Sequence, residues 1–264
     1  MDVVLLFTAA GLVAGFLSGL LGIGGGLVLI PVFAAVFAAQ GVDAAVLMPL
    51  TMGTSLATII FTSFSSLRAH HARGCVDWTL FRRMAPGLAI GSLCGAVVST
   101  QLPGVALKVA FVIFAGFAAT QLLLGRQSQS TRGLPGGSAL TATAGGLGVV
   151  SGLVGVGAAT LTVPLLTWCS ISMRTAIGSA SALAFPIALA GTSAYVISGL
   201  NVTDLPPSSF GYVHLPALAG VVIASVFAVP VGAATSHRLP IATLRKVFAV
   251  GLYAAAGKML VATM

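Results

Sequence analysis

Long apolar runs, separated by short polar segments, fill almost the whole chain. A membrane-spanning helix needs about 20 predominantly apolar residues. Runs of this kind lie at 44–67, 84–101, 105–124, 175–199, 212–236 and 242–263. Two further apolar stretches, 3–39 and 138–172, are too long for one span. The pattern therefore predicts an all-α polytopic membrane protein.

Clustered glycines interrupt both of the long stretches. The first reads Gly-Leu-Leu-Gly-Ile-Gly-Gly-Gly over residues 19–26, and the second reads Gly-Leu-Val-Gly-Val-Gly over residues 152–157. A glycine in a helix interior costs about 1 kcal/mol relative to alanine, so such clusters break helices. Each long stretch is therefore expected to form two half-helices around a non-helical tip.

The second long stretch repeats the first at a constant offset. Residues 15–24 match residues 148–157, and Pro31 then matches Pro164. Further matches follow in the same order: Gly53-Thr54 with Gly178-Ser179, Gly74 with Gly211, and Gly95 with Gly232. We therefore predict a first transmembrane repeat over 1–124, a polar linker over 125–137 and a second transmembrane repeat over 138–264.

The positive charges predict how the two repeats are oriented. If each broken stretch is a hairpin that returns to its own side, each repeat makes three crossings and the second is inverted. With the N-terminus outside, every lysine and arginine except Lys108 and Lys258 then falls inside, as the positive-inside rule requires. If each broken stretch instead crossed the membrane twice, the loops would lie on the same sides. A hairpin and two short spans are therefore both possible for each broken stretch. The expected fold is two inverted-topology repeats, each a glycine-broken helical hairpin plus three transmembrane helices.

Composition agrees with this class and excludes others. Only 6% of the residues are charged and 58% are hydrophobic, whereas a soluble domain carries about 25% charged residues. The net charge of +8 comes from bases in loops between apolar spans, which is a topological feature and not a nucleic-acid patch. The three cysteines are widely spaced and fit no metal or redox pattern. We expect a multi-pass protein of the bacterial cytoplasmic (inner) membrane, without cofactor or metal.

The paired breaks predict the position of a binding site. Interrupted helices at matching places in two repeats are the best sequence indication of a transport site. A helix start offers free N–H groups and about half a positive charge, glycines let the backbone approach a ligand, and hydroxyls add donors. An anion site is thus expected where the two tips meet. The residues predicted to contact the substrate are Ser18, Gly22, Gly24, Gly25, Gly26, Thr54, Ser55, Ser151, Gly155, Gly157, Thr160, Ser179 and Ser181.

Charged residues outside the spans complete the prediction. Arg68, His70, His71 and Arg73 lie in the longest basic loop. They are interpreted either as a vestibule that concentrates anions on the inner side or as interfacial residues that set the topology. The four acidic residues lie at the N-terminus or in loops, so no carboxylate is expected in mid-membrane.

Three motifs, taken in order along the chain, resemble those of a known family. They are Gly-x-Gly-Gly-Gly at 22–26, in the stretch that ends at Pro31, Gly-Thr-Ser at 53–55, and Gly-x-Val-Asp-Trp at 74–78. Together they resemble the TauE/SafE family, also called the TSUP superfamily, over nearly the whole chain. The resemblance implies a permease for sulfite, sulfonates and related small anions. The second half departs from the pattern at Ala158-Ala159 and at Gly178-Ser179-Ala180.

The expected function is a secondary transporter of small sulfonate- or sulfite-type anions, with export as the expected direction and the lipid bilayer as its other partner. A passive anion channel is the main alternative, although inverted repeats suit alternating access. An intramembrane serine protease is a third reading, because residues 15–19 fit G-x-S-x-G in letters. That motif needs a strand-to-helix turn, whereas a helix is predicted here. No nucleic-acid partner and no enzymatic activity are expected.

Overall fold

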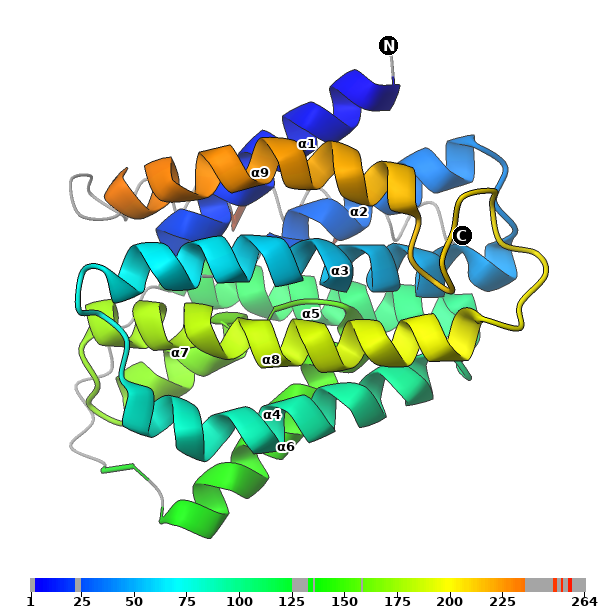
Figure 1. Cartoon of the computed structure of the whole chain (residues 1–264). Helices are drawn as coiled ribbons and strands as arrows, with labels where there is room; N and C mark the ends of the chain where they lie inside the picture. Colours follow the sequence, from blue (N-terminus) through cyan, green and yellow to red (C-terminus); the bar gives the residue numbers. More distant parts are fainter. Residues whose placement is uncertain are drawn as a thin grey trace.

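The described residues of the computed structural model are 3–21, 25–124, 133–134, 136–157, 159–235, 249–250, 253 and 256–257. Within them the chain is a bundle of helices joined by loops, with no β-strand (Figure 1). The helices are α1 (Val3–Leu21), α2 (Gly26–Ala39), α3 (Ala44–His71), α4 (Trp78–Ser99), α5 (Gly104–Leu124), α6 (Gly137–Val154), α7 (Ala159–Trp168), α8 (Met173–Gly199) and α9 (Leu215–Thr235). The predicted all-α fold is confirmed.

The helices follow the apolar runs closely. Helices α3, α5, α6, α8 and α9 are long and apolar enough to cross a membrane. The two over-long stretches each form two helices, α1 with α2 and α6 with α7, with a break at the predicted glycines. Most of the predicted span 242–263 lies outside the described residues.

Two helix boundaries differ from the prediction for one physical reason. Helix α3 continues past residue 67 to His71, and α4 begins at Trp78, before the predicted span start at residue 84. Charged side chains can lie on the ends of a spanning helix where it leaves the hydrocarbon region. His70 and His71 therefore belong to the last turn of α3 and not to a loop, which corrects the prediction.

The caps explain where the long helices start and stop. Asp43 accepts a hydrogen bond from the Ala45 N–H at 2.7 Å, and Asp77 accepts from the N–H groups of the first turn of α4. At the other end of α3, Gly74 has a φ of 67° and the Cys75 N–H bonds to the His70 carbonyl at 3.1 Å. This is the glycine-terminated ending that is common in helices. Two of the chain's four acids thus serve as helix caps.

Two central helices, α3 and α8, lie side by side and run in opposite directions (Figure 1). Helix α1 packs along α9 on one side of them, and α6 packs along α4 on the other. The loop at 72–77 lies at one end of the bundle and the loop at 200–214 at the opposite end. Loops that are equivalent in the sequence repeat are therefore at opposite ends.

The crossings of α1 with α9 and of α6 with α4 are built on glycines. A Cβ added at any of these glycines would lie between 2.0 and 2.4 Å from a backbone carbonyl oxygen of the facing helix. The contacts pair Gly15 with Ser225 and Gly148 with Leu88, Gly19 with Val229 and Gly152 with Ser92, and Gly232 with Phe16 and Gly95 with Val149. Small residues that let helix backbones approach closely are typical of membrane proteins. Each contact named between α1 and α9 thus has a counterpart between α6 and α4, at the residues matched by the repeat.

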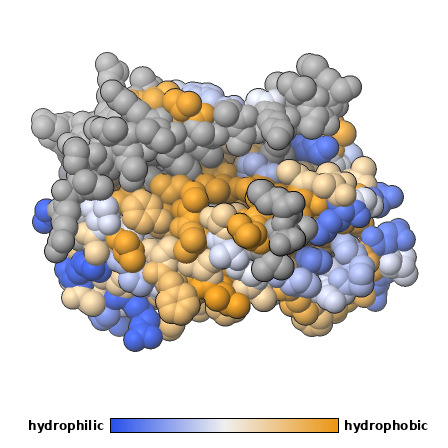
Figure 2. Space-filling model, turned by 90° about the horizontal axis from the view of Figure 1, so that it is seen from above, coloured by the Kyte–Doolittle hydropathy of each residue, from blue (hydrophilic) through white to orange (hydrophobic). Residues whose placement is uncertain are grey.

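The outer surface is apolar between two polar ends. Figure 2 shows a belt of hydrophobic residues with hydrophilic residues gathered at both sides of it. Large apolar side chains are strongly exposed on several helices, among them Ile90 of α4, Ile113 of α5 and Phe227 of α9, the last 75% exposed. A soluble protein rarely exposes such a continuous surface. The belt is the face that contacts lipid in a multi-pass membrane protein.

Candidate functional site

The two helix breaks lie beside each other on α3. Gly26 is the first residue of α2, and a Cβ added to it would lie 3.1 Å from Ser55 Oγ and 3.2 Å from the Gly155 carbonyl oxygen. Ser55 Oγ itself donates a hydrogen bond to the Gly155 carbonyl at 3.0 Å. Three residues predicted for the site, one from each break and one from α3, are thus in contact. We call this region the tip junction.

The backbone at the tip junction has conformations that favour glycine. Gly25 has a φ of 78° and Gly155 a φ of 74°, both in the left-handed region. The N–H groups of Gly155 and Val156 both bond to the Ser151 carbonyl, at 3.0 and 3.1 Å, which ends α6. A Cβ on Gly155 would lie 2.7 Å from Cβ of Met52. Glycine is needed at Gly155 both for its backbone conformation and for lack of space.

Three predicted hydroxyls near the breaks are buried without a hydrogen-bond partner. Ser18 is 1% exposed, Ser151 0% and Thr160 7%, and none has a partner within the described part of the chain. Serine and threonine in a helix commonly bond a carbonyl of the preceding turn, and leaving a buried hydroxyl unpaired costs about 1–3 kcal/mol. Ser66, Thr192 and Ser209 share this property but lie farther from the breaks in sequence. The unpaired groups near the tips are suited to a ligand.

Other predicted hydroxyls are already used by the protein. Thr54 Oγ1 donates to the Leu50 carbonyl at 2.7 Å and accepts from the His214 N–H at 3.0 Å. In the matching place, Ser179 Oγ accepts from the Asp77 N–H at 3.0 Å. The Thr54 hydroxyl thus holds the residue before the start of α9, and the Ser179 hydroxyl holds the residue before the start of α4. The hydroxyl of Ser181 donates to its own helix, so the geometry gives these three residues a structural role.

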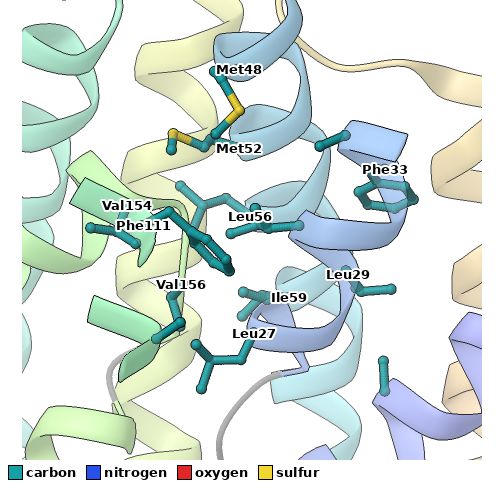
Figure 3. Packing of buried hydrophobic residues seen from close by; sticks show 14 of the residues in the cluster. Leu27, Leu29, Phe33, Met48, Met52, Leu56, Ile59, Phe111, Val154 and Val156 are labelled. Atoms are coloured by element: carbon teal, nitrogen blue, oxygen red, sulfur yellow. The ribbon is translucent and has the colours of Figure 1, made fainter. Parts of the chain in front are cut away.

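Apolar side chains surround the tip junction. Figure 3 shows Leu27, Ile59, Leu56 and Met52 facing Val156 and Val154 across the region between the two breaks, with Phe111 of α5 beside them. Leu27, Met52, Leu56, Ile59, Phe111 and Val156 are 0% exposed. Gly157 is buried next to the second break, and Gly22 and Gly24 lie outside the described residues. The junction is therefore a small set of hydroxyl and backbone groups in apolar surroundings.

Of the basic residues predicted to form a vestibule, three are exposed and one is buried. Arg68, His71 and Arg73 are exposed; His71 Nδ1 accepts a hydrogen bond from Trp78 Nε1 at 3.3 Å, and Arg73 donates to the Ala69 carbonyl at 2.6 Å. His70 is only 2% exposed, and its Nε2 donates to the Gly19 carbonyl at 3.1 Å, because a carbonyl can only accept. His70 thus contacts the end of α1, just before the first break.

Sequence reasoning missed the counterpart of His70. Tyr195 lies in α8 at the place that corresponds to His70 in α3, and its hydroxyl donates to the Gly152 carbonyl at 3.2 Å. Gly152 is the residue that the repeat matches to Gly19. Each broken helix is thus held just before its tip by a buried polar side chain of a central helix. A comparison of residue types could not find the pair, because one member is histidine and the other tyrosine.

The structure gives the serine-protease motif no fitting local geometry. Residues 15–19 lie inside α1, and Gly15 and Gly19 pack against the backbone of α9. A nucleophile elbow needs a strand-to-helix turn that exposes the serine, whereas Ser18 is buried in mid-helix. In the described ranges, no group of three or more His, Cys, Asp or Glu residues could hold a metal ion.

A membrane bundle with two broken helices that meet at its centre has the architecture of a membrane transporter. The profile of the family described as "Sulfite exporter TauE/SafE" matches residues 7–259. The chain belongs to the TauE/SafE family, and it is a membrane transporter.

Curated relatives have the same general description. The chain is 33% identical over 261 residues, 97% of each chain, to the "Probable membrane transporter protein" of Haemophilus influenzae. It is 28% identical over 209 residues to YunE of Bacillus subtilis, covering 72% of this chain and 77% of that protein. It is 26% identical over 289 residues to MamO of Paramagnetospirillum magneticum, covering 94% of this chain and 43% of that protein. No solved structure matches the chain.

Proposed function

We propose that this transporter exports small sulfite- or sulfonate-type anions across a bacterial cytoplasmic membrane and binds them at the tip junction. The observation that carries the proposal is the group of buried, unpaired hydroxyls of Ser18, Ser151 and Thr160 near the two breaks. Helix starts at Gly26 and Ala159 add N–H groups to the same region. The printed description of the matching family, a sulfite exporter, supports the substrate class and the direction.

Binding should depend on those hydroxyls. Ser151→Ala and Thr160→Val each remove one donor of about 1 kcal/mol net, so each is expected to weaken anion binding about fivefold, and both together more. The measurement is the rise in melting temperature of the purified protein with sulfite or methanesulfonate, since a ligand stabilises the folded state it binds. The control is Ser193→Ala, because Ser193 is exposed and bonds its own helix at Leu189. Unchanged ligand stabilisation in the double variant would move the site elsewhere.

The proposed mechanism is alternating access by two inverted repeats, residues 1–124 and 138–264, joined by 125–137. It is supported by the matched glycine contacts and by the opposite ends at which the equivalent loops lie. A passive anion channel is separated from this mechanism by counterflow. Unlabelled substrate loaded inside vesicles should drive a transient accumulation of labelled substrate through a carrier, whereas a channel gives none.

Inverted repeats predict the sidedness of two exposed loops. In a cysteine-free background, Ala72→Cys should react only with a reagent on the cytoplasmic side, and Asp204→Cys only with a reagent outside. Both residues are exposed in the loops that follow α3 and α8. The measurement is labelling of intact cells with a membrane-impermeant maleimide, compared with inverted vesicles. Reaction of both positions from one side would rule out the inverted arrangement.

A further inference from the structure

No arginine, lysine or aspartate is buried among the residues that the structure describes. Every described arginine is exposed and lies near a helix end or in a loop, and Lys108 is half-buried near the start of α5. Among the described residues, the buried polar side chains are serines, threonines, two histidines and the tyrosines Tyr195 and Tyr212. Among the described residues, the junction therefore offers an anion hydroxyls and backbone N–H groups.

The two buried histidines are already engaged with backbone groups. His70 donates from Nε2 to the Gly19 carbonyl. His214 accepts the Ala217 N–H on Nδ1 at 3.3 Å and lies edge-on to Phe37, with ring centroids 5.2 Å apart. An imidazole nitrogen that accepts a hydrogen bond is unprotonated. His214 is thus a neutral helix cap. The Nε2 donor of His70 is used in its hydrogen bond to α1.

Among the described residues, two helix starts supply positive potential at the junction. Helix α2 begins at Gly26, against Ser55 and Gly155, and α7 begins at Ala159, two residues after Gly157. Each start contributes about half of an elementary charge. Together they offset about one negative charge, not two.

Desolvation also favours a singly charged anion over a doubly charged one. The walls of the junction, Leu27, Met52, Ile59 and Val156, are apolar and fully buried (Figure 3). The cost of moving an ion into such surroundings grows with the square of its charge, so it is about fourfold larger for a dianion than for a monoanion of equal size. Two helix starts and a few hydroxyls do not supply the extra stabilisation.

We propose that the tip junction selects singly charged oxyanions over doubly charged ones of the same size. Organosulfonates and hydrogensulfite are then substrates, whereas sulfate and the sulfite dianion are excluded. This inference rests on the proposed function, because it assumes that the junction is where the anion binds.

The test uses a pair of ligands that differ in charge and hardly in shape. Methanesulfonate and sulfate share three sulfur-bound oxygens, and a methyl group in the first replaces the fourth oxygen of the second. Methanesulfonate is expected to stabilise the purified protein and to inhibit counterflow of labelled substrate at concentrations at least about tenfold lower than sulfate does. Ionic strength is held constant with chloride. Equal potency of the two ligands would overturn the inference while leaving the proposed function intact.

A second arm varies the charge of one ligand with pH. The potency of total sulfite should rise as pH falls through the ionisation of hydrogensulfite, in proportion to the monoanion fraction. Methanesulfonate keeps its charge over this range, so its potency should stay constant, and any change in it reports an effect of pH on the protein itself. A flat response of sulfite, or a parallel change of both ligands, would count against selection by ligand charge. If neither ligand binds or competes, the proposed function fails and the inference fails with it.

Discussion

Gly152→Ala should strongly destabilise the protein, and membranes should contain little of it in folded form. A methyl group at this position would lie 2.1 Å from the carbonyl oxygen of Ser92 and 2.8 Å from the Ser92 Cα. Both atoms are backbone, so they yield only if α6 moves away from α4. Overpacking of this kind costs about 1–3 kcal/mol when side chains adjust, and we expect the upper end or more here. Separation would also disturb the hydrogen bond from Tyr195 to the Gly152 carbonyl.

The measurement is the melting temperature and yield of the purified variant, with Gly146→Ala as control. Gly146 lies in the same helix, is exposed and has nothing within 4 Å of an added Cβ. Alanine there should be neutral or slightly stabilising, because it raises helix propensity by about 1 kcal/mol. Gly19→Ala, which would lie 2.0 Å from the Val229 carbonyl, should behave like Gly152→Ala. If Gly152→Ala proved as stable as Gly146→Ala, the close helix crossing would be wrong.

The breaks and spans were predictable because their cause is local in sequence. A cluster of glycines weakens any helix, and an apolar run of spanning length needs no knowledge of its neighbours. The prediction failed where helices leave the membrane. The end of α3 at His70 and His71 and the start of α4 before residue 84 carry polar residues. A span predicted from apolar residues alone is therefore shorter than the helix.

The hydrogen bonds of the predicted hydroxyls could not be read from the sequence. Thr54 and Ser179, both predicted to contact substrate, each accept the backbone N–H of a residue distant in sequence, His214 and Asp77. Nothing in the sequence distinguishes Ser151 from these two residues, yet its hydroxyl has no hydrogen-bond partner in the described structure. Which hydroxyl is free depends on what the fold brings to it, and that information is not local.

The tip junction itself depends on a contact between the two halves. The repeat predicted that the breaks would approach each other, but only the structure places Ser55 in contact with Gly155 and beside Gly26. The sequence already shows an asymmetry, since Ser55 corresponds to Ala180 in α8. Only the structure shows that Ser55 uses its hydroxyl to bond the second tip.

Gly26→Ala should abolish most transport while the protein stays folded. Its methyl group would lie 3.0 Å from Ile59 Cδ1, 3.1 Å from Ser55 Oγ and 3.2 Å from the Gly155 carbonyl oxygen. Shifts of a few tenths of an ångström relieve such contacts, so we expect a cost near the lower end of the roughly 1–3 kcal/mol typical of overpacking. The methyl group nevertheless occupies the space between the tips, where the backbone must approach the anion. Gly25 is a poorer test, because its φ of 78° would strain any side chain.

The expected result is a loss of counterflow of at least about tenfold, which corresponds to about 1.4 kcal/mol or more, with a melting temperature that is lowered only slightly. Gly116→Ala in α5 is the matched control, since an added Cβ there has nothing within 4 Å. Ser55→Ala tests the same region without added bulk: it removes the hydrogen bond to the Gly155 carbonyl and frees the second tip from α3. It should reduce counterflow less than Gly26→Ala does and lower the melting temperature more, because it leaves a buried carbonyl without that donor. Full counterflow in both folded variants would show that the substrate does not pass through the tip junction.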